Sequence, residues 1–270
     1  MKTIKKRWFY PLVILGMSLT SCMTTDDPGM TVVSKTNQQD LKSDIKESSA
    51  SRKGKKLKDR DGNEYSTVQI GTQLWMAENL KTTKYNDGSD IPLVIDNTAW
   101  SELSTGAYCW WNNDENINIG QDAMYNHGAL YNWYAVETTK LCPSNWHVPS
   151  DADWNTLSDY LGGNSVSGGK MKSVGTEYWS FPNTGATNES GFSGLPTGVR
   201  ISEGFFAGIG TNADFWSSSE KDASTAYPRD LQANTEELLL EPNGTPKEFG
   251  FAVRCLMDNS VDENGKVIKN

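Results

Sequence analysis

The sequence predicts one loop-rich domain built from many short strands and one well-marked helix. Residues 178–258 break into strand-sized segments separated by Gly, Pro, Asn and Asp, a pattern typical of short strands joined by turns. The chain holds 10 Trp and 24 Gly but few long aliphatic runs, which favours an aromatic-packed, loop-rich fold over a helical bundle. The helix is predicted from the stretch LCPSNWHVPSDADWNTLSDYL, residues 141–161.

Ser150 marks the predicted start of this helix. Its hydroxyl can accept from the backbone N–H of Asp153, whose carboxylate can answer back to Ser150 as in a capping box. Asp151 and Asp153 also lie where the positive end of the helix dipole favours acids. A buried stripe is predicted at positions spaced i, i+3 and i+7: Trp154, Leu157 and Leu161. A helix start therefore explains these acidic residues without catalysis.

Other elements are predicted less sharply. Residues 64–70 alternate as a strand should, after a turn at Asp61-Gly62, and residues 73–76 form a second short strand beyond Gly71. Residues 128–136, GALYNWYAV, fit an apolar helix or strand. Residues 161–172, LGGNSVSGGKMK, are interpreted as a glycine-rich connection.

The first 21 residues have the features of a secretory signal peptide. A basic head is followed by a short apolar run, which is too short to span a bilayer as a mature helix, and then by small residues. The following LTSC resembles the lipobox of bacterial lipoproteins, which implies that Cys22 is acylated with chains such as palmitate. Two or three acyl chains on Cys22 would provide stable membrane anchoring.

The chain after Cys22 is predicted to form three parts. Residues 22–56 are polar, without a sustained apolar period, and are expected to be a flexible lipidated tether. Residues 57–258 are expected to fold as one domain, and residues 259–270 as a polar tail. Asp26 and Asp27 resemble export signals of lipoproteins in Bacteroidetes-like bacteria, which implies an outer-membrane protein displayed on the cell surface.

The charge of the chain disfavours polyanionic partners. The sequence has 25 Lys and Arg against 34 Asp and Glu, and four of the basic residues lie in the signal peptide. The mature chain would therefore carry 21 basic and 34 acidic residues, a net charge of −13. Nucleic acid is not expected as a partner, and the membrane is expected to be reached through the lipid anchor alone.

The cysteines and histidines disfavour a metal site. Three cysteines remain after Cys22, so an oxidising compartment would give one disulfide and one remaining thiol among Cys109, Cys142 and Cys255. The only histidines are His127 and His147, and no CxxC pair is present, so a four-ligand zinc site is not expected. We expect no metal and no cofactor.

Seven motifs follow one another along the chain: IGTQLWMAENL, YCWWNND, GALYNWYAV, LCPSNWHVPSDADWNTL, GATNESGFSGLPTGVR, FWSSSE and GFAVRCL. Their order resembles the Fibrobacter succinogenes major paralogous domain, found in secreted and lipid-anchored bacterial proteins. The resemblance covers residues 57–258.

Two of these segments, Pro149–Trp154 and Gly250–Cys255, are distantly similar to the superfold of the formylglycine-generating enzyme and C-type lectins. This similarity implies an α+β, C-type-lectin-like domain with small antiparallel sheets, one or two helices, long irregular loops and paired termini. It also implies a Cys142–Cys255 disulfide, which would leave Cys109 as a buried thiol. A Cys109–Cys142 pairing stays open as the alternative.

An enzyme is not expected. Formylglycine generation needs a close thiol pair, and one disulfide would leave a single thiol. His147 lies near Ser150 and Asp151, yet the chain has no G-x-S-x-G nucleophile elbow.

Calcium-dependent sugar binding of the lectin type is not expected either. Calcium-dependent lectins carry an EPN triplet before a WND triplet, whereas here WNND at residues 111–114 precedes EPN at residues 241–243.

The remaining function is binding. Tryptophans beside polar loops suit carbohydrate rings, although each one taken alone is more often a core residue. The candidate ligand residues are Trp110, Trp111, Asp114, Trp179, Asn188, Glu189, Asp214 and Trp216. We expect a non-enzymatic, lipid-anchored envelope protein that binds a glycan or another surface protein. A structural component of a surface appendage is the alternative, and an enzyme of the formylglycine-generating type is a weaker one.

Overall fold

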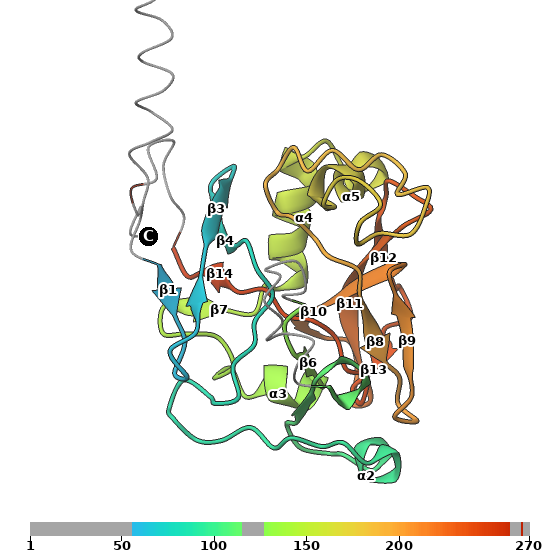
Figure 1. Cartoon of the computed structure of the whole chain (residues 1–270). Helices are drawn as coiled ribbons and strands as arrows, with labels where there is room; N and C mark the ends of the chain where they lie inside the picture. The colour runs from blue at the N-terminus through green and yellow to red at the C-terminus, as the bar shows by residue number, and fades with distance from the viewer. Residues whose placement is uncertain (1–55, 115–126, 260–265, 267–270) are drawn as a thin grey trace, which may run out of the picture. The chain divides into compact units, whose positions relative to one another are not determined.

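The computed structural model of the protein describes residues 56–114, 127–259 and 266. These residues form an α+β fold of small antiparallel sheets, short helices and irregular loops (Figure 1). The α+β class expected from the sequence is therefore confirmed. The predicted signal peptide, Cys22, the tether up to residue 55 and most of the predicted tail lie outside the described residues.

The two ends of the domain meet in one four-stranded sheet of order β3-β4-β14-β7. The strand β14 near the C-terminus lies between β4 and β7, with Leu256 opposite both Trp75 and His147. A hairpin of β1 and β2 precedes this sheet, and Gly62 occupies the positive-φ position in its turn. The strands predicted at residues 64–70 and 73–76 are confirmed, with a break at Ser66. The bounds are β1 (Leu57–Lys58), β2 (Glu64–Tyr65), β3 (Thr67–Ile70), β4 (Gln73–Met76), β7 (Trp146–His147) and β14 (Leu256–Met257).

A second sheet is built on the long antiparallel pair β10 and β11. β11 also pairs with β12 and β13 on its other edge. Two further two-stranded sheets are formed by β5 with β6 and by β8 with β9. The bounds are β5 (Tyr108–Cys109), β6 (Leu130–Tyr131), β8 (Thr197–Arg200), β9 (Phe206–Ile209), β10 (Asn212–Glu220), β11 (Thr225–Gln232), β12 (Leu238–Leu240) and β13 (Thr245–Pro246).

The helices are short, and none in the described part of the chain is long and apolar enough to cross a membrane. Residues 128–136 contain both β6 and the start of α3, which is capped by Asn132. α4 and α5 lie next to each other, whereas α2 lies at the opposite end of the domain (Figure 1). The bounds are α2 (Asn97–Ser101), α3 (Trp133–Glu137), α4 (Asp151–Tyr160) and α5 (Asn164–Met171), with a 3-10 turn η1 (Trp111–Asn113).

The helix α5 corrects the interpretation of residues 161–172 as a glycine-rich connection. A Cβ on Gly168 would lie 2.2 Å from the carbonyl oxygen of Glu237, and one on Gly169 would lie 2.4 Å from that of Gly185. The glycines are therefore required where this helix packs directly on neighbouring backbone. Close packing, rather than loop flexibility, explains the local composition.

The core is aromatic, as the composition predicts. Trp75 and Trp154 pack with ring centroids 4.9 Å apart, and Phe192 and Phe215 complete the same cluster. A second cluster contains the Cys142–Cys255 disulfide, whose Cα atoms are 5.9 Å apart, so the implied pairing is confirmed. Cys109 is a buried free thiol, and its burial raises its pKa to about 12.

Candidate functional site

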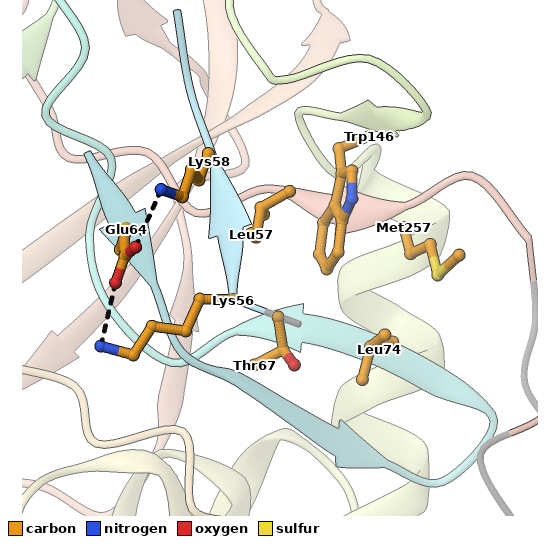
Figure 2. Close-up of a pocket in the computed structure, with 8 residues that line it drawn as sticks. All are labelled: Lys56, Leu57, Lys58, Glu64, Thr67, Leu74, Trp146 and Met257. Atoms are coloured by element: carbon orange, nitrogen blue, oxygen red, sulfur yellow. Dashed lines mark ion pairs between the residues drawn. The ribbon is translucent and has the colours of Figure 1, made fainter. Parts of the chain in front are cut away.

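An open groove lies between the β1–β2 hairpin and the four-stranded sheet β3-β4-β14-β7 (Figure 2). Its volume is about 800 Å³, within the usual range of ligand pockets. We call it the Trp146 groove because its largest lining side chain is this half-buried indole. The lining residues are Lys56, Leu57, Lys58, Glu64, Thr67, Leu74, Trp146 and Met257.

The apolar part of the groove is assembled by strand pairing. Trp146 on β7 lies directly opposite Met257 on β14, so both side chains leave the same face of the sheet. Figure 2 shows Leu57 of β1 pointing toward the Trp146 ring, with Leu74 and Thr67 nearby on β4 and β3. The groove therefore combines an aromatic and aliphatic wall with a hydroxyl group.

The charged part of the groove lies across β1. Successive strand residues point to opposite sides, so Lys56 and Lys58 turn away from Leu57 and both reach Glu64, at 3.2 and 3.0 Å (Figure 2). Hydrogen bonds from Lys58 and then Lys56 lower the pKa of Glu64. Solvent screens exposed ion pairs of this kind, so a polar ligand could replace one of them at little cost.

His147, the residue after Trp146 on β7, connects the strands that form the wall of the groove. Its Nδ1 lies 2.9 Å from Asp258 Oδ1, and its Nε2 lies 3.4 Å from Asp153 Oδ2. The hydrogen bond to Asp153, aided by Asp258 and opposed by burial, raises the pKa of His147. This arrangement, the His147 clasp, joins β7 to the end of β14 and to the first turn of α4.

The His147 clasp does not form a nucleophile–base pair. The Ser150 hydroxyl donates to Asp153 Oδ2 at 2.5 Å, so a carboxylate separates this hydroxyl from the imidazole. The capping box predicted between Ser150 and Asp153 is present in both directions. Asp151 instead contacts the buried guanidinium of Arg229 at 2.5 Å. The helix-start interpretation of these residues is confirmed.

Two of the candidate ligand tryptophans are core residues. Trp179 and Trp216 are both 0% exposed. Trp179 Nε1 donates to the carbonyl of Gly194 at 3.0 Å, and Trp216 Nε1 donates to that of Tyr131 at 2.8 Å. Their polar atoms are satisfied internally and their rings face other side chains. The expectation that they bind ligand is corrected, because in this fold tryptophans take the place of aliphatic core residues.

Asp214 is also turned inward. It lies opposite Asp230 in the β10–β11 pair, and the two are 6% and 5% exposed. Burial, followed by the neighbouring carboxylate, raises the pKa of Asp214 well above its ordinary value, and burial raises the pKa of Asp230 to about 6. Asp214 is thus one half of a buried carboxyl pair and not an exposed ligand residue.

Asn188 and Glu189 lie on a surface loop outside the Trp146 groove. The Asn188 amide donates to the Ser193 hydroxyl at 2.9 Å and accepts from the Ser193 backbone N–H at 2.8 Å, so it stabilises its own loop. Glu189 is exposed and lies 3.7 Å from Lys170. The structure does not bring either residue to the groove.

Trp110, Trp111 and Asp114 lie near a different surface. Trp110 and Trp111 are half-buried, Trp111 packs edge-on against Phe206 at 5.2 Å, and Asp114 is exposed. Close to them are three exposed apolar side chains that we call the apolar face: Leu93 (49% exposed), Ile95 (58%) and Phe205 (60%). The sequence-based candidates therefore divide between the core, a loop and the edge of this face.

The residues of the Trp146 groove were missed because no local pattern marks them. Trp146 packs partly against the core cluster that contains Val148. The groove appears only when β14, from the far end of the domain, pairs beside β7. No three His, Cys, Asp or Glu side chains come together as metal ligands within the described residues.

The comparisons with known proteins identify the family. The model of the Fibrobacter succinogenes major domain matches residues 68–257, well over half of the chain. No curated protein and no solved structure gave a significant match. The C-type-lectin-like character of the fold therefore stays a prediction. By the extent of the family match, the chain belongs to the Fibrobacter succinogenes major domain family.

Proposed function

We propose that this chain is a lipid-anchored protein of the outer membrane, displayed on the cell surface, whose domain binds a glycan in the Trp146 groove. Binding is non-enzymatic. The observation that carries the proposal is an open groove in which an indole stands beside aliphatic side chains, a hydroxyl and ionised groups. The anchor rests on the sequence of residues 1–22, which lie outside the described structure.

Carbohydrate rings suit this combination. A pyranose presents an apolar face of C–H groups, which packs on an indole, and a rim of hydroxyls, which need hydrogen-bond partners. Trp146 would supply the packing surface, while Thr67 and the Lys56–Glu64–Lys58 cluster would supply donors and acceptors. Because Lys58 and Leu57 leave β1 on opposite sides, a ligand longer than one sugar ring is needed to contact both parts.

A glycan array probed with the full-length chain in detergent tests this proposal. We expect binding to a defined set of oligosaccharides, and Trp146→Ala should weaken it by about 10-fold or more. Trp110→Ala is the matched control, since Trp110 is also half-buried but lies outside the groove. Equal loss in both variants, or no glycan binding by the parent chain, would contradict the proposal.

Lipid anchoring is tested separately. Cys22→Ser removes the acylated thiol, so we expect the protein to move from the membrane pellet to the soluble fraction. Cys109→Ser, at the thiol buried inside the domain, is the control for a general effect of losing a cysteine. Protease treatment of intact cells then reports whether the parent protein is displayed outside. Persistent membrane pelleting of Cys22→Ser would rule the anchor out.

A role in assembly is the second candidate, and one observation favours it. The apolar face exposes about half or more of three large apolar side chains. Single exposed apolar residues are normal on a protein surface, but several in one region indicate an interaction site. Such a surface suits a protein partner and does not depend on the Trp146 groove.

A further inference from the structure

The apolar face is carried by two loops that are bonded to each other through Arg200. The Arg200 guanidinium donates to the carbonyls of Val94 and Ile95, at 2.6 and 3.0 Å, and its Nε donates to the carbonyl of Gly204 at 2.9 Å. A Cβ on Gly204 would lie 2.6 Å from Asn97 Cα, so the two backbones are in direct contact. The loop that carries Leu93 and Ile95 is therefore held against the loop that carries Phe205.

The apolar face is also rigid. Arg200 is completely buried, and its guanidinium lies over the Trp100 ring at 4.2 Å and over the Phe206 ring at 5.1 Å. Asn113 adds a hydrogen bond to the Ile95 carbonyl at 3.0 Å. A surface held in this way is already in its binding shape, which reduces the entropy lost on association.

The apolar face extends along an edge strand. Among the described strands, β9 pairs with β8 alone. Exposed positions alternate from Phe205, the residue before β9, to Ala207 and Ile209 within it. None of these positions carries the charge or proline that normally protects an edge strand from unwanted pairing. The unprotected edge and the apolar side chains together favour a partner that docks here by strand or side-chain contact.

The charged side chains within the two segments that carry the apolar face are of one sign. Residues 93–114 and 201–209 contain Asp96, Glu102, Asp114 and Glu203 but no lysine and no arginine. All four acidic residues are exposed. A second copy of this chain would bring the same four acids to the interface and be repelled, as would an anionic lipid surface.

We infer that the apolar face docks a protein partner whose contacting segment presents apolar side chains flanked by lysine or arginine. The apolar centre supplies the buried area, and the acidic rim selects for a basic flank and against the chain itself. This partner site is separate from the Trp146 groove and does not require a glycan.

Site-specific photo-crosslinking in the cells that produce the protein tests this inference. A benzophenone side chain is placed at Phe205 and, as the control, at Phe181, which is 87% exposed elsewhere on the surface. The expected result is a crosslink specific to position 205, with the joined peptide of the partner mapped by mass spectrometry. That peptide should contain apolar residues next to lysine or arginine.

Charge reversal completes the test. Glu102→Lys combined with Glu203→Lys should lower the crosslink yield at position 205 by at least about fivefold, since the basic flank then meets lysines. Glu137→Lys combined with Glu177→Lys makes the same change of net charge at exposed sites elsewhere and should leave the yield unchanged. Thermal unfolding of each variant confirms that the fold is kept.

The inference is overturned by any of four results. Position 205 crosslinks no more than position 181, or it joins a second copy of this chain, or it joins lipid or residues 115–126 of the same chain. The fourth is a crosslink to a partner whose yield is the same in both charge-reversed variants.

Discussion

The Trp146 groove and the apolar face show two ways in which this chain builds a surface. The groove is assembled from β1 to β4, from β7 and from β14, three parts of the chain that are far apart in the sequence. The Cys142–Cys255 disulfide lies next to β7 and β14 and holds this wall. The apolar face is built from two loops fastened by a single buried arginine. The first has an indole with charges of both signs and suits a polar small ligand. The second is apolar with a negative rim and suits a macromolecule.

Removing the disulfide should have the largest effect on stability, and it should destabilise the groove before the apolar face. Cys142 and Cys255 are 113 residues apart, and closing such a loop stabilises the fold by at most about 4–5 kcal/mol on the chain-entropy model. Cys142→Ala with Cys255→Ala should lower the free energy of unfolding by about 2–5 kcal/mol in denaturant titration. Hydrogen exchange should increase first at β7 and β14, and later near Ile95 and Phe205.

Cys109→Ala is the matched control for this prediction. It removes a buried thiol that is in no disulfide, so it should cost far less and leave the order of exchange unchanged. If the disulfide variant loses protection against hydrogen exchange equally at the groove and at the apolar face, the two surfaces unfold as one cooperative unit. The proposed difference between them is then wrong.

Arg200→Met should act on the other region. The substitution removes the guanidinium donor from the carbonyls of Val94 and Gly204, and leaves that of Ile95 with the Asn113 amide alone. It should cost on the order of 2 kcal/mol in unfolding free energy. Glycan binding in the groove should persist, while the crosslink at Phe205 should fall. Arg60→Met is the control, because Arg60 is exposed and donates to a single carbonyl. Loss of glycan binding in Arg200→Met would contradict this division.

The contrast between the regions also explains what the sequence could predict. The helix α4 was predictable because its cap and its buried stripe are local signals within ten residues. The helix α5 was not, because its glycines serve contacts with distant backbone. Tryptophan count indicates an aromatic core but does not say which indoles are exposed, so Trp179 and Trp216 were misassigned whereas Trp146 was overlooked. The disulfide pairing came from family resemblance and not from residue spacing.

The buried Asp214–Asp230 pair gives the third prediction, which concerns the dependence of stability on pH. This dependence must be measured apart from any that His147 causes at the groove. Burial raises both pKa values above those of the unfolded chain, so the folded state binds more protons. Stability should therefore fall as pH rises from about 4 through the raised pKa values of the pair. Asp214→Asn should raise the unfolding free energy at pH 8, because it removes the buried charge, and should flatten this dependence in denaturant titrations across this pH range. Asp159→Asn, on the exposed side of α4, is the control. A pH profile unchanged in Asp214→Asn would contradict the assignment.

The smallest expected effect belongs to the His147 clasp, and it is specific to the groove. Asp153 and Asp258 raise the pKa of His147, so its contribution is fully present below the unfolded pKa near 6.5 and is lost as pH rises through the folded value. The contribution of Asp153 runs the other way: its pKa is lowered by hydrogen bonds from His147 and Ser150, against the effect of burial, and its stabilisation is lost at acid pH.

The difference in stability between the parent and His147→Gln should therefore be greatest just below the ordinary pKa of about 6.5 and disappear at alkaline pH. Its size should stay below about 1 kcal/mol, because the His147 side chain is 40% exposed and solvent screens the ion pairs. Thermal unfolding at several pH values measures the difference. Both chains should also carry Asp214→Asn, so that the buried carboxyl pair does not add its own pH dependence. Hydrogen exchange then locates it: protection should fall at β7 and β14, which the clasp joins, and not at β9. A difference that persists unchanged at pH 9 would mean that His147 acts through packing alone, and the groove wall would then have no pH-dependent support.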